Sequence, residues 1–194
     1  MPVITLTPTL LLSASSQLAQ RVVSSGFTPG VIIGVLNGGA QVARQMLGSL
    51  PVEARYCEVC ISRPSTRQKK QNTAHQLMRA LPLWLCDVLR ELESRITSLR
   101  KSSSLVRLGD VTLPADVEAL LSSSPCQVLI VDDAIDSGAT MQKVKEQLLT
   151  RFPSINLRVA VITVTTDHPI CDADFALYHN HTLCRFPWSN DYRE

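Results

Sequence analysis

The stretch that most constrains this chain runs from Val128 to Met141, where an apolar run is followed by three acids and a turn of small residues. Residues 128–131 are all aliphatic, as in a strand that is buried on both faces of a parallel sheet. Residues 141–152 then carry apolar side chains at helical spacing. The stretch therefore predicts a buried strand, a tight turn and a helix, in that order.

This order of elements also predicts a binding site for a phosphorylated sugar. Backbone N–H groups at the start of a helix lack partners within the helix and carry the positive end of its dipole, which suits a phosphate. Residues 137–140 are small or carry hydroxyls, so a phosphate can approach their backbone. Asp132 and Asp133 would repel a phosphate but accept hydrogen bonds from sugar hydroxyls. Helix capping is the alternative interpretation, and it accounts for one acid but not for three.

The stretch resembles the motif that binds phosphoribosyl pyrophosphate (PRPP) in the type I phosphoribosyltransferase family. In that family an apolar strand leads into two acids, two apolar residues and often Asp-Thr-Gly-x-Thr. Residues 132–140 here read Asp-Asp-Ala-Ile-Asp-Ser-Gly-Ala-Thr, so only Ser137 departs from the pattern, and it keeps the hydroxyl group. The resemblance implies a PRPP site at the end of this strand.

The resemblance also assigns roles to the residues of the motif. It implies that Asp132 and Asp133 bind the ribose of PRPP. The 5′-phosphate is implied to lie on the turn formed by Asp136, Ser137, Gly138, Ala139 and Thr140. An acid at position 136 is typical of members that act on purines, and we expect Asp136 to act as the general base or acid at the ring nitrogen of the base.

A second buried strand is predicted over 30–36, and it breaks at a glycine pair before a helical pattern over 40–47. Such glycines allow positive φ and the close approach of a ligand, although they also close ordinary loops. The residues at this break resemble the pyrophosphate loop of the same family: Leu36, Asn37, Gly38 and Gly39. That loop often contains a non-proline cis peptide, here between Leu36 and Asn37. Family members commonly have Arg or Lys at the position of Asn37.

A polar and basic segment follows a third predicted strand, which covers 52–62. Its place in the chain resembles that of a flexible loop in the family. We predict a lid that neutralises pyrophosphate and excludes water, with a solvated surface segment as the alternative. Its basic residues are Arg63, Arg67, Lys69 and Lys70. The pattern of 74–99 is strongly helical, which predicts a helical insertion at about 72–110 that packs against the sheet or a second subunit.

The end of the chain is predicted to hold two more strands, at 157–164 and 175–178, and a small hood over the base at about 165–194. In purine-type relatives a lysine after the late strand often contacts the 6-oxo group of the base, and Thr165 stands at that position here. Phe186 and Trp188 are predicted to stack on a base. A core position is the alternative for Trp188.

The cysteines predict neither a disulfide framework nor a zinc site. The six cysteines are scattered through a chain whose length allows a normal core. Cys57 and Cys60 are expected on opposite faces of a strand, where they could not easily share a metal ion. A second group has no recognised zinc spacing and is given structural or solvent-facing roles: His168, Cys171, His179 and His181.

Composition narrows the class of protein. With 45% hydrophobic and 19% charged residues, the chain is predicted to form one globular domain over 1–194. A net charge of +2 argues against a nucleic-acid partner. No apolar run approaches the roughly 18 residues that span a bilayer, and no basic residues precede the leucines near the N-terminus, so we expect a cytoplasmic protein without a membrane partner.

The expected fold is α/β, with a mostly parallel central sheet and helices on both faces. The resemblance implies an enzyme that moves the 5-phosphoribosyl group from PRPP to a nitrogen of a purine-like base and releases pyrophosphate. It further implies Mg²⁺ held mainly through PRPP rather than by direct protein ligands, and a homodimer. A PRPP-binding regulatory protein without turnover is the alternative. A different nucleotide-binding α/β protein is a more distant one, and it has no obvious use for the acid pair.

Overall fold

The computed structural model describes residues 3–50, 53–60, 109–123, 125–179 and 182–193. The predicted lid, with its four basic side chains, lies outside these residues. So does nearly all of the predicted helical insertion. Both therefore stay predictions.

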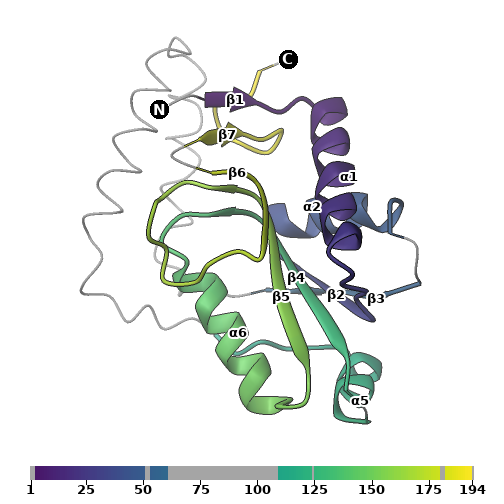
Figure 1. The fold of residues 1–194 in the computed structure, drawn as a ribbon. Coiled ribbons are helices and arrows are strands. Elements are labelled where there is room, and N and C mark those ends of the chain that lie inside the picture. Colours follow the sequence, from purple (N-terminus) through teal and green to yellow (C-terminus); the bar gives the residue numbers. More distant parts are fainter. Residues whose placement is uncertain (1–2, 51–52, 61–108, 124, 180–181, 194) are drawn as a thin grey trace.

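Five parallel strands form the central sheet, in the spatial order β3-β2-β4-β5-β6 (Figure 1). The strands are β2 (Val31–Val35), β3 (Arg55–Val59), β4 (Gln127–Ile135), β5 (Asn156–Val164) and β6 (Phe175–Tyr178). Each was predicted from the sequence, although β3 is shorter than the predicted 52–62 and β4 continues through the acid pair. The expected mostly parallel sheet is confirmed.

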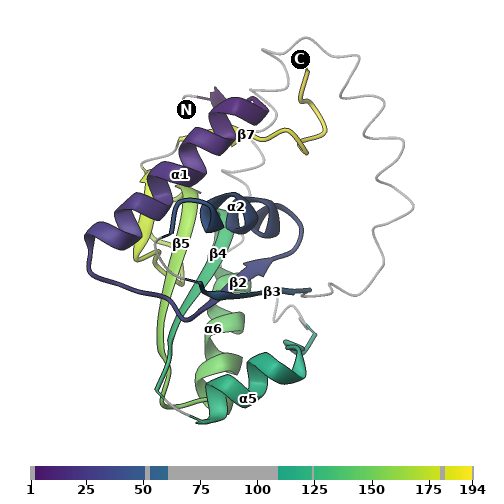
Figure 2. The ribbon, with the colours of Figure 1, turned by 90° about the vertical axis from the view of Figure 1, so that its right-hand side faces the viewer.

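Helices cover both faces of this sheet, as predicted. They are α1 (Pro8–Ser24), α2 (Gly38–Leu47), α5 (Ala115–Ser123) and α6 (Ala139–Arg151). In Figure 2, α1 and α2 lie together and apart from α5 and α6. Ile32 packs in the core beneath α1 and α2, whereas the next residue, Ile33, packs in the core beneath α5 and α6. Successive strand residues point to opposite faces, so a strand covered on both faces needs apolar residues at every position.

Helix α1 begins at Pro8. Thr7 is the N-cap, and its side-chain oxygen accepts a hydrogen bond from the N–H of Leu10 at 3.3 Å. Proline at the first helical position has a backbone angle that already suits a helix. Leu10 and Leu12 are both 51% exposed. The first turns therefore lack the one-sided apolar stripe that indicates a helix in a sequence.

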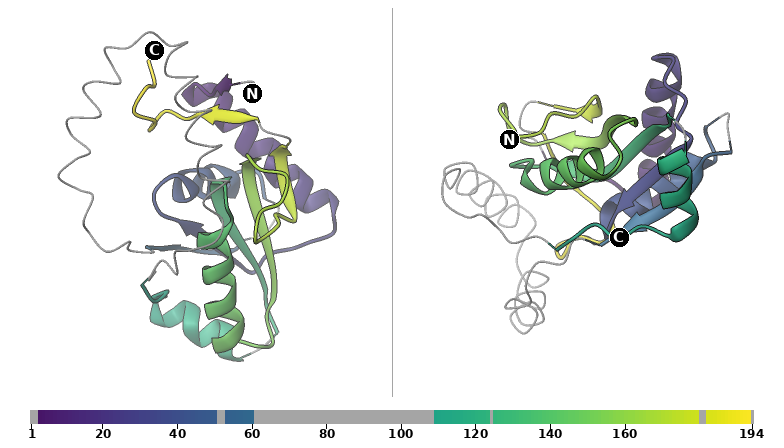
Figure 3. Two further views of the ribbon diagram at one scale, coloured as in Figure 1. Left: turned by 90° about the vertical axis from the view of Figure 1, so that its left-hand side faces the viewer. Right: turned by 90° about the horizontal axis from the view of Figure 1, so that it is seen from below.

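Two short strands, β1 (Val3–Thr5) and β7 (Leu183–Arg185), form a second parallel pair that the sequence did not predict. Three residues are too few for a periodic pattern. Arg185 is buried and fixes the pair, because its Nε donates to Asp191 and its Nη1 donates to Thr5, each at 2.9 Å. The pair lies on the side of the sheet where the carboxyl ends of β4 and β5 are found (Figure 3).

The connections place three loops at one edge of the sheet. The loop from β2 to α2, the turn from β4 to α6 and the segment after β5 all leave carboxyl ends of adjacent parallel strands. In open α/β sheets, ligands bind at this edge. Within the described ranges, no helix is both long and apolar enough to cross a membrane.

Candidate active site

Asp132 and Asp133 lie near the end of β4, the middle strand of the sheet. The N–H of Asp133 donates to Asp132 Oδ1 at 2.9 Å. Burial raises the pKa of Asp132 well above its ordinary value, and the neighbouring Asp133 charge raises it further. Burial also raises the pKa of Asp133, while hydrogen bonds with the side chains of Asp132 and Trp188 act in the opposite direction. The unliganded pair is therefore reluctant to carry two charges and gains from added hydrogen-bond donors or a cation.

The predicted pyrophosphate loop lies directly against this acid pair. The peptide bond between Leu36 and Asn37 is cis, as the family resemblance implies. A Cβ atom on Gly38 would lie 2.0 Å from Asp133 Oδ2. A Cβ atom on Gly39 would lie 2.4 Å from the carbonyl oxygen of Val131. A side chain at Gly39 would collide with the backbone of β4, and one at Gly38 would displace the Asp133 carboxylate. The two glycines therefore allow the loop to pack onto β4 and its acid pair.

The reason for this glycine pair differs from one that the sequence suggested. Positive φ was one expected use of glycine here, but among the described glycines only Gly26 and Gly138 have it. Gly38 and Gly39 are buried and belong to the first turn of α2, whereas Leu36 and Asn37 are exposed. The glycines are required for close packing of the loop, and the exposed half of the loop faces solvent.

The predicted phosphate turn, residues 136–140, joins β4 to the start of α6. Gly138 is the N-cap of α6 and has a φ of 78°, which favours glycine. A Cβ atom there would also lie 2.7 Å from the backbone nitrogen of Cys171. The N–H of Ile170 donates to the carbonyl of Ser137 at 2.9 Å. The loop after β5 therefore holds the turn in place, and the N–H groups at the start of α6 point to an anion site, although that of Ala139 also donates to Ser137 Oγ at 3.4 Å.

Asp136 is exposed and has a buried neighbour in Thr165. The Thr165 hydroxyl donates to Asp136 Oδ1 at 2.5 Å, and the Thr165 N–H donates to the carbonyl of Ile135 at 3.0 Å. Thr165 was predicted to face the base. In the structure its hydroxyl holds the carboxylate of Asp136, and a direct contact of Thr165 with a base stays a prediction.

Phe186 and Trp188 stack on each other, with ring centroids 4.9 Å apart and an angle of 6° between the planes. Phe186 is buried and Trp188 is half-buried. The indole Nε1 of Trp188 donates to Asp133 Oδ2 at 2.9 Å. The hood thus reaches the acid pair itself, and the two aromatic side chains come from opposite ends of the Phe-Pro-Trp sequence.

Three sets of contacts at the site were not predicted from the sequence. The backbone of residues 170–171 braces the phosphate turn, the Thr165 hydroxyl bonds to Asp136, and the indole of Trp188 bonds to Asp133. The bracing residues carry no motif, because they act through backbone atoms. The Phe-Pro-Trp sequence did signal Trp188, but spacing along the chain gave no indication that its partner would be an acid 55 residues away.

The described part of the chain offers no dedicated protein metal centre. It contains no cluster of three or more His, Cys, Asp or Glu side chains that could hold a metal ion. Cys57 is buried and Cys60 is exposed, in line with the expected opposite orientations. His181, one member of the second predicted group, lies outside the described residues.

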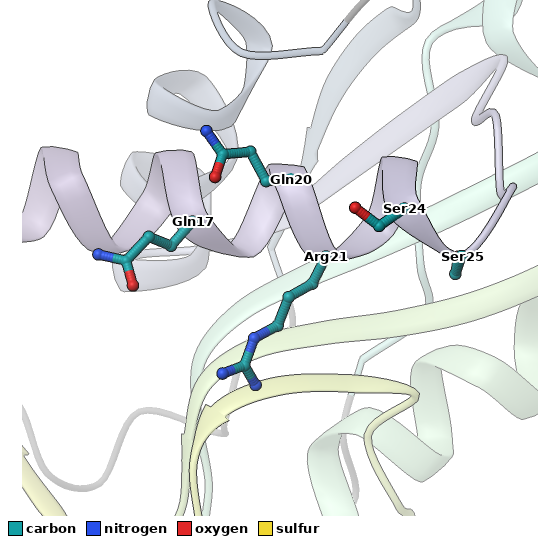
Figure 4. Close-up of a pocket in the computed structure, with 5 residues that line it drawn as sticks. All are labelled: Gln17, Gln20, Arg21, Ser24 and Ser25. Carbon is teal, nitrogen blue, oxygen red and sulfur yellow. The ribbon is translucent and has the colours of Figure 1, made fainter.

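A surface hollow on α1 lies apart from these loops (Figure 4). Its lining side chains all come from the end of that one helix: Gln17, Gln20, Arg21, Ser24 and Ser25. The guanidinium of Arg21 donates to the carbonyl of Ala176 in β6, so this cation ties α1 to the sheet edge. The hollow contains no acid and adds nothing to the site.

The open parallel sheet carries a glycine loop, an acid pair and a helix-start turn at its strand ends, which is the arrangement with which α/β proteins bind phosphorylated sugars and nucleotides. The phosphoribosyl transferase domain family matches residues 9–173, and the chain belongs to this family. It is thereby a phosphoribosyltransferase, a glycosyltransferase type of enzyme. No curated protein matches the chain in a sequence comparison.

Solved structures agree with the fold. Purine phosphoribosyltransferase from Pyrococcus horikoshii Ot3 superposes with a TM-score of 0.61 at 16% identity, over 97% of this chain and 95% of that one. Xanthine-guanine-hypoxanthine phosphoribosyltransferase from Helicobacter pylori gives 0.60 at 14% identity, over 96% and 92%. A hypothetical protein from Neisseria gonorrhoeae with bound ppGpp gives 0.60 at 16% identity, over 96% and 89%. At sequence identities this low, the structural similarity shows a shared fold and nothing further.

Proposed function

We propose that the protein transfers the 5-phosphoribosyl group of PRPP to a ring nitrogen of a purine-like base and releases pyrophosphate. One observation carries the proposal: the acid pair, the glycine loop and the helix-start turn meet at the end of β4. A Cβ on Gly38 would touch Asp133, and the phosphate turn follows the acids within the same connection. PRPP carries three matching groups: a sugar diol for the acid pair, a pyrophosphate for the glycine loop and a phosphate for the helix-start turn.

Donor binding divides among the three features. Asp132 and Asp133 accept hydrogen bonds from the ribose hydroxyls, which relieves the cost of their buried charge. Residues 137–140 receive the 5′-phosphate on backbone N–H groups at the start of α6. The exposed backbone of Leu36 and Asn37 takes the pyrophosphate. Asn37 carries no charge, so the predicted lid would supply the cations for this group.

Asp136 serves as the general base or acid at the ring nitrogen that bonds to the ribose carbon. It lies between the ribose acids and the phosphate turn, and its carboxylate is exposed to an incoming base. Thr165 holds Oδ1 of that carboxylate at 2.5 Å and so fixes its orientation. A proton at the ring nitrogen would pass to Asp136 as the glycosidic bond forms and the bond to pyrophosphate breaks.

Magnesium fits this site as an ion held mainly by the donor. Mg²⁺ prefers oxygen ligands and is usually held by one or two carboxylates together with substrate phosphates. The carboxylates of Asp132 and Asp133 are the nearest protein candidates, and no larger ligand cluster exists among the described side chains. When bound, the ion would supply charge stabilisation for the departing pyrophosphate.

We further propose that the protein acts as a homodimer in the cytoplasm.

A PRPP-binding regulator without turnover is the second candidate function. Two observations favour it: Asn37 leaves the pyrophosphate loop uncharged, and Thr165 replaces the lysine expected at the base. The two candidates share donor binding and differ in whether pyrophosphate is released.

Pyrophosphate release from PRPP and Mg²⁺ tests the proposal across guanine, hypoxanthine, xanthine, adenine, orotate and uracil. We expect release with a purine. Asp136→Asn should lower turnover by about 100-fold while the affinity for PRPP holds, because it removes a proton-transfer group without touching the ribose site. Asp116→Asn, an exposed acid in the first turn of α5, is the matched control. PRPP binding without release for any base would favour the regulator.

A further inference from the structure

The hydrogen bond between Trp188 and Asp133 occupies an acceptor of the donor site. The indole Nε1 lies 2.9 Å from Asp133 Oδ2. The same oxygen is the atom nearest to a Cβ built on Gly38, and Trp188 Cζ2 would lie 2.9 Å from that Cβ. The indole therefore fills the corner between the carboxylate and the glycine loop.

We propose that Trp188 is a placeholder for a sugar hydroxyl, which leaves Asp133 when PRPP binds and returns when the site empties. The inference rests on the proposed function, because it requires Asp133 to bind the ribose. It assigns Trp188 to the donor site, in addition to the base-stacking role predicted from the sequence.

A hydrogen-bond donor at Asp133 stabilises the empty site, because burial makes the charged form of this carboxylate unfavourable. A half-buried carboxylate without hydrogen-bond donors pays a desolvation penalty, and burial indeed raises the pKa of Asp133 while the indole opposes that rise. An indole has one N–H to donate, whereas a ribose diol has two hydroxyl donors. The diol can therefore replace the indole at Asp133 without leaving the acid unpartnered.

The local structure anchors the chain on either side of Trp188 but leaves the indole on a turn. Phe186 is buried, and its N–H donates to Ser189 Oγ while its carbonyl accepts from the Ser189 N–H. Asp191 is held by the buried Arg185. Trp188 projects from the turn between these anchors and is half-buried. Rotation of its side chain would expose Asp133 without unfolding the hood.

Trp188→Phe tests the exchange, because phenylalanine keeps an aromatic ring against Phe186 and removes the N–H. Calorimetry with PRPP and Mg²⁺ should show tighter binding by about tenfold, which corresponds to ~1.4 kcal/mol. The reason is that no hydrogen bond has to break first. Trp84→Phe changes the other tryptophan in the sequence and is the matched control. Unchanged or weaker binding in Trp188→Phe would overturn the proposal.

Fluorescence gives a second readout that keeps Trp188 in place. In the Trp84→Phe background, Trp188 is the remaining tryptophan. Its emission should change on titration with PRPP and with ribose 5-phosphate, since both carry the diol. Constant emission, together with calorimetric binding of PRPP, would refute the placeholder and leave the proposed function standing. Absence of PRPP binding in the wild type and in both variants would refute the two together.

Discussion

The two loops that we propose bind PRPP, residues 36–39 and 136–140, are called the donor loops. They differ from the hood in the kind of contact that holds them in place. The donor loops are held by close packing around glycines, because any Cβ on Gly38, Gly39 or Gly138 would come within 2.7 Å of a neighbouring atom. That atom belongs to the backbone at Gly39 and Gly138, and to the side chain of Asp133 at Gly38. The hood meets the acids of the site through side chains, namely the hydroxyl of Thr165 and the indole of Trp188, and braces the phosphate turn through the backbone of residues 170–171. The family match covers residues 9–173, which include both donor loops and Thr165, and ends before β6, β7 and Trp188.

The difference shows which part of the site can vary. A backbone contact tolerates only glycine, so the sequence of the donor loops is tightly restricted by the packing of the sheet edge. A side-chain contact can be rebuilt with another residue. Under the proposed function, recognition of the donor would therefore depend on the fold, whereas recognition of the acceptor would depend on exchangeable side chains.

The largest effect is expected for the acid pair. Replacing Asp132 and Asp133 together with Ala should abolish PRPP binding in calorimetry, because hydrogen bonds to charged groups contribute about 1.5–3 kcal/mol each. The glycine loop should remain in place, since the variant adds no atoms near it. Asp116→Ala, on a helix that precedes β4, is the control and should bind normally. PRPP binding of wild-type strength in the double variant would contradict the ribose assignment.

An intermediate effect is expected where a glycine contacts backbone. Gly39→Ala would place Cβ 2.4 Å from the Val131 carbonyl and 2.6 Å from Asp132 Cα, and neither atom can move without shifting β4. We expect a loss of about 1–3 kcal/mol in the free energy of unfolding, as in other overpacked sites, together with weaker PRPP binding. Urea unfolding and calorimetry measure the two effects.

Gly48→Ala is the matched control for this variant. Gly48 ends the same helix, α2, has a φ of −67° and has no atom within 4 Å of a built Cβ. We expect its stability to stay equal to that of the wild type or to rise slightly. Equal losses in the two variants would mean that the contact of Gly39 with β4 is not the cause.

The donor loops could be predicted from the sequence because each is marked by a local residue pattern and each follows directly after a strand of the sheet. The aliphatic run before Asp132 could only be a buried strand, and the small residues after Asp136 could only be a turn. Parallel strands then bring the glycine loop to the same edge of the sheet. The residue order therefore determined both the fold and the location of the donor loops.

The hood was less predictable because its contacts join residues far apart in the chain. The strands β1 and β7 have three residues each, and the residues that hold them together, Thr5 and Arg185, are separated by 180 positions. The buried pair of Arg185 and Asp191 looks like ordinary surface charge in the sequence. Short elements fixed by long-range side-chain bonds have no periodic signal, and so the hood was predicted only as a region.

The acid pair should also make the stability of the fold depend on pH. Burial and the neighbouring charge raise the pKa of Asp132, so the folded state binds a proton at this carboxyl more tightly than the unfolded state does. The free energy of unfolding should therefore rise as the pH falls from neutral towards the ordinary carboxyl range near ~4. Asp132→Asn removes the charge and should be more stable than the wild type at neutral pH.

Urea unfolding at about pH 5 and about pH 7.5 measures this effect. The advantage of Asp132→Asn should shrink on acidification, because the wild-type carboxyl then becomes neutral as well. The amide oxygen of asparagine can still accept from the N–H of Asp133, so backbone geometry is retained. An advantage that stays the same at both pH values would show that the charge of Asp132 is not costly in the folded state.

The smallest effect is expected in the hood, at Thr165. Thr165→Val removes the hydroxyl that holds Asp136 and keeps the shape of the side chain. Losing one hydrogen bond of about 1 kcal/mol should lower turnover by a few-fold, while PRPP affinity stays unchanged because the acid pair is untouched. Steady-state kinetics with the base found in the screen, together with calorimetry, separate the two quantities.

Thr163→Val makes this last test specific. Thr163 is also buried, and its hydroxyl donates to the carbonyl of Thr182 at 2.7 Å, away from Asp136. Both variants lose one buried hydrogen bond at the end of β5, so both should lose similar stability. Only Thr165→Val should lower turnover, since only Thr165 orients the carboxylate that meets the base. A similar loss of turnover in Thr163→Val would assign the effect to the strand, and the hood would then act on the acceptor through packing rather than through Asp136.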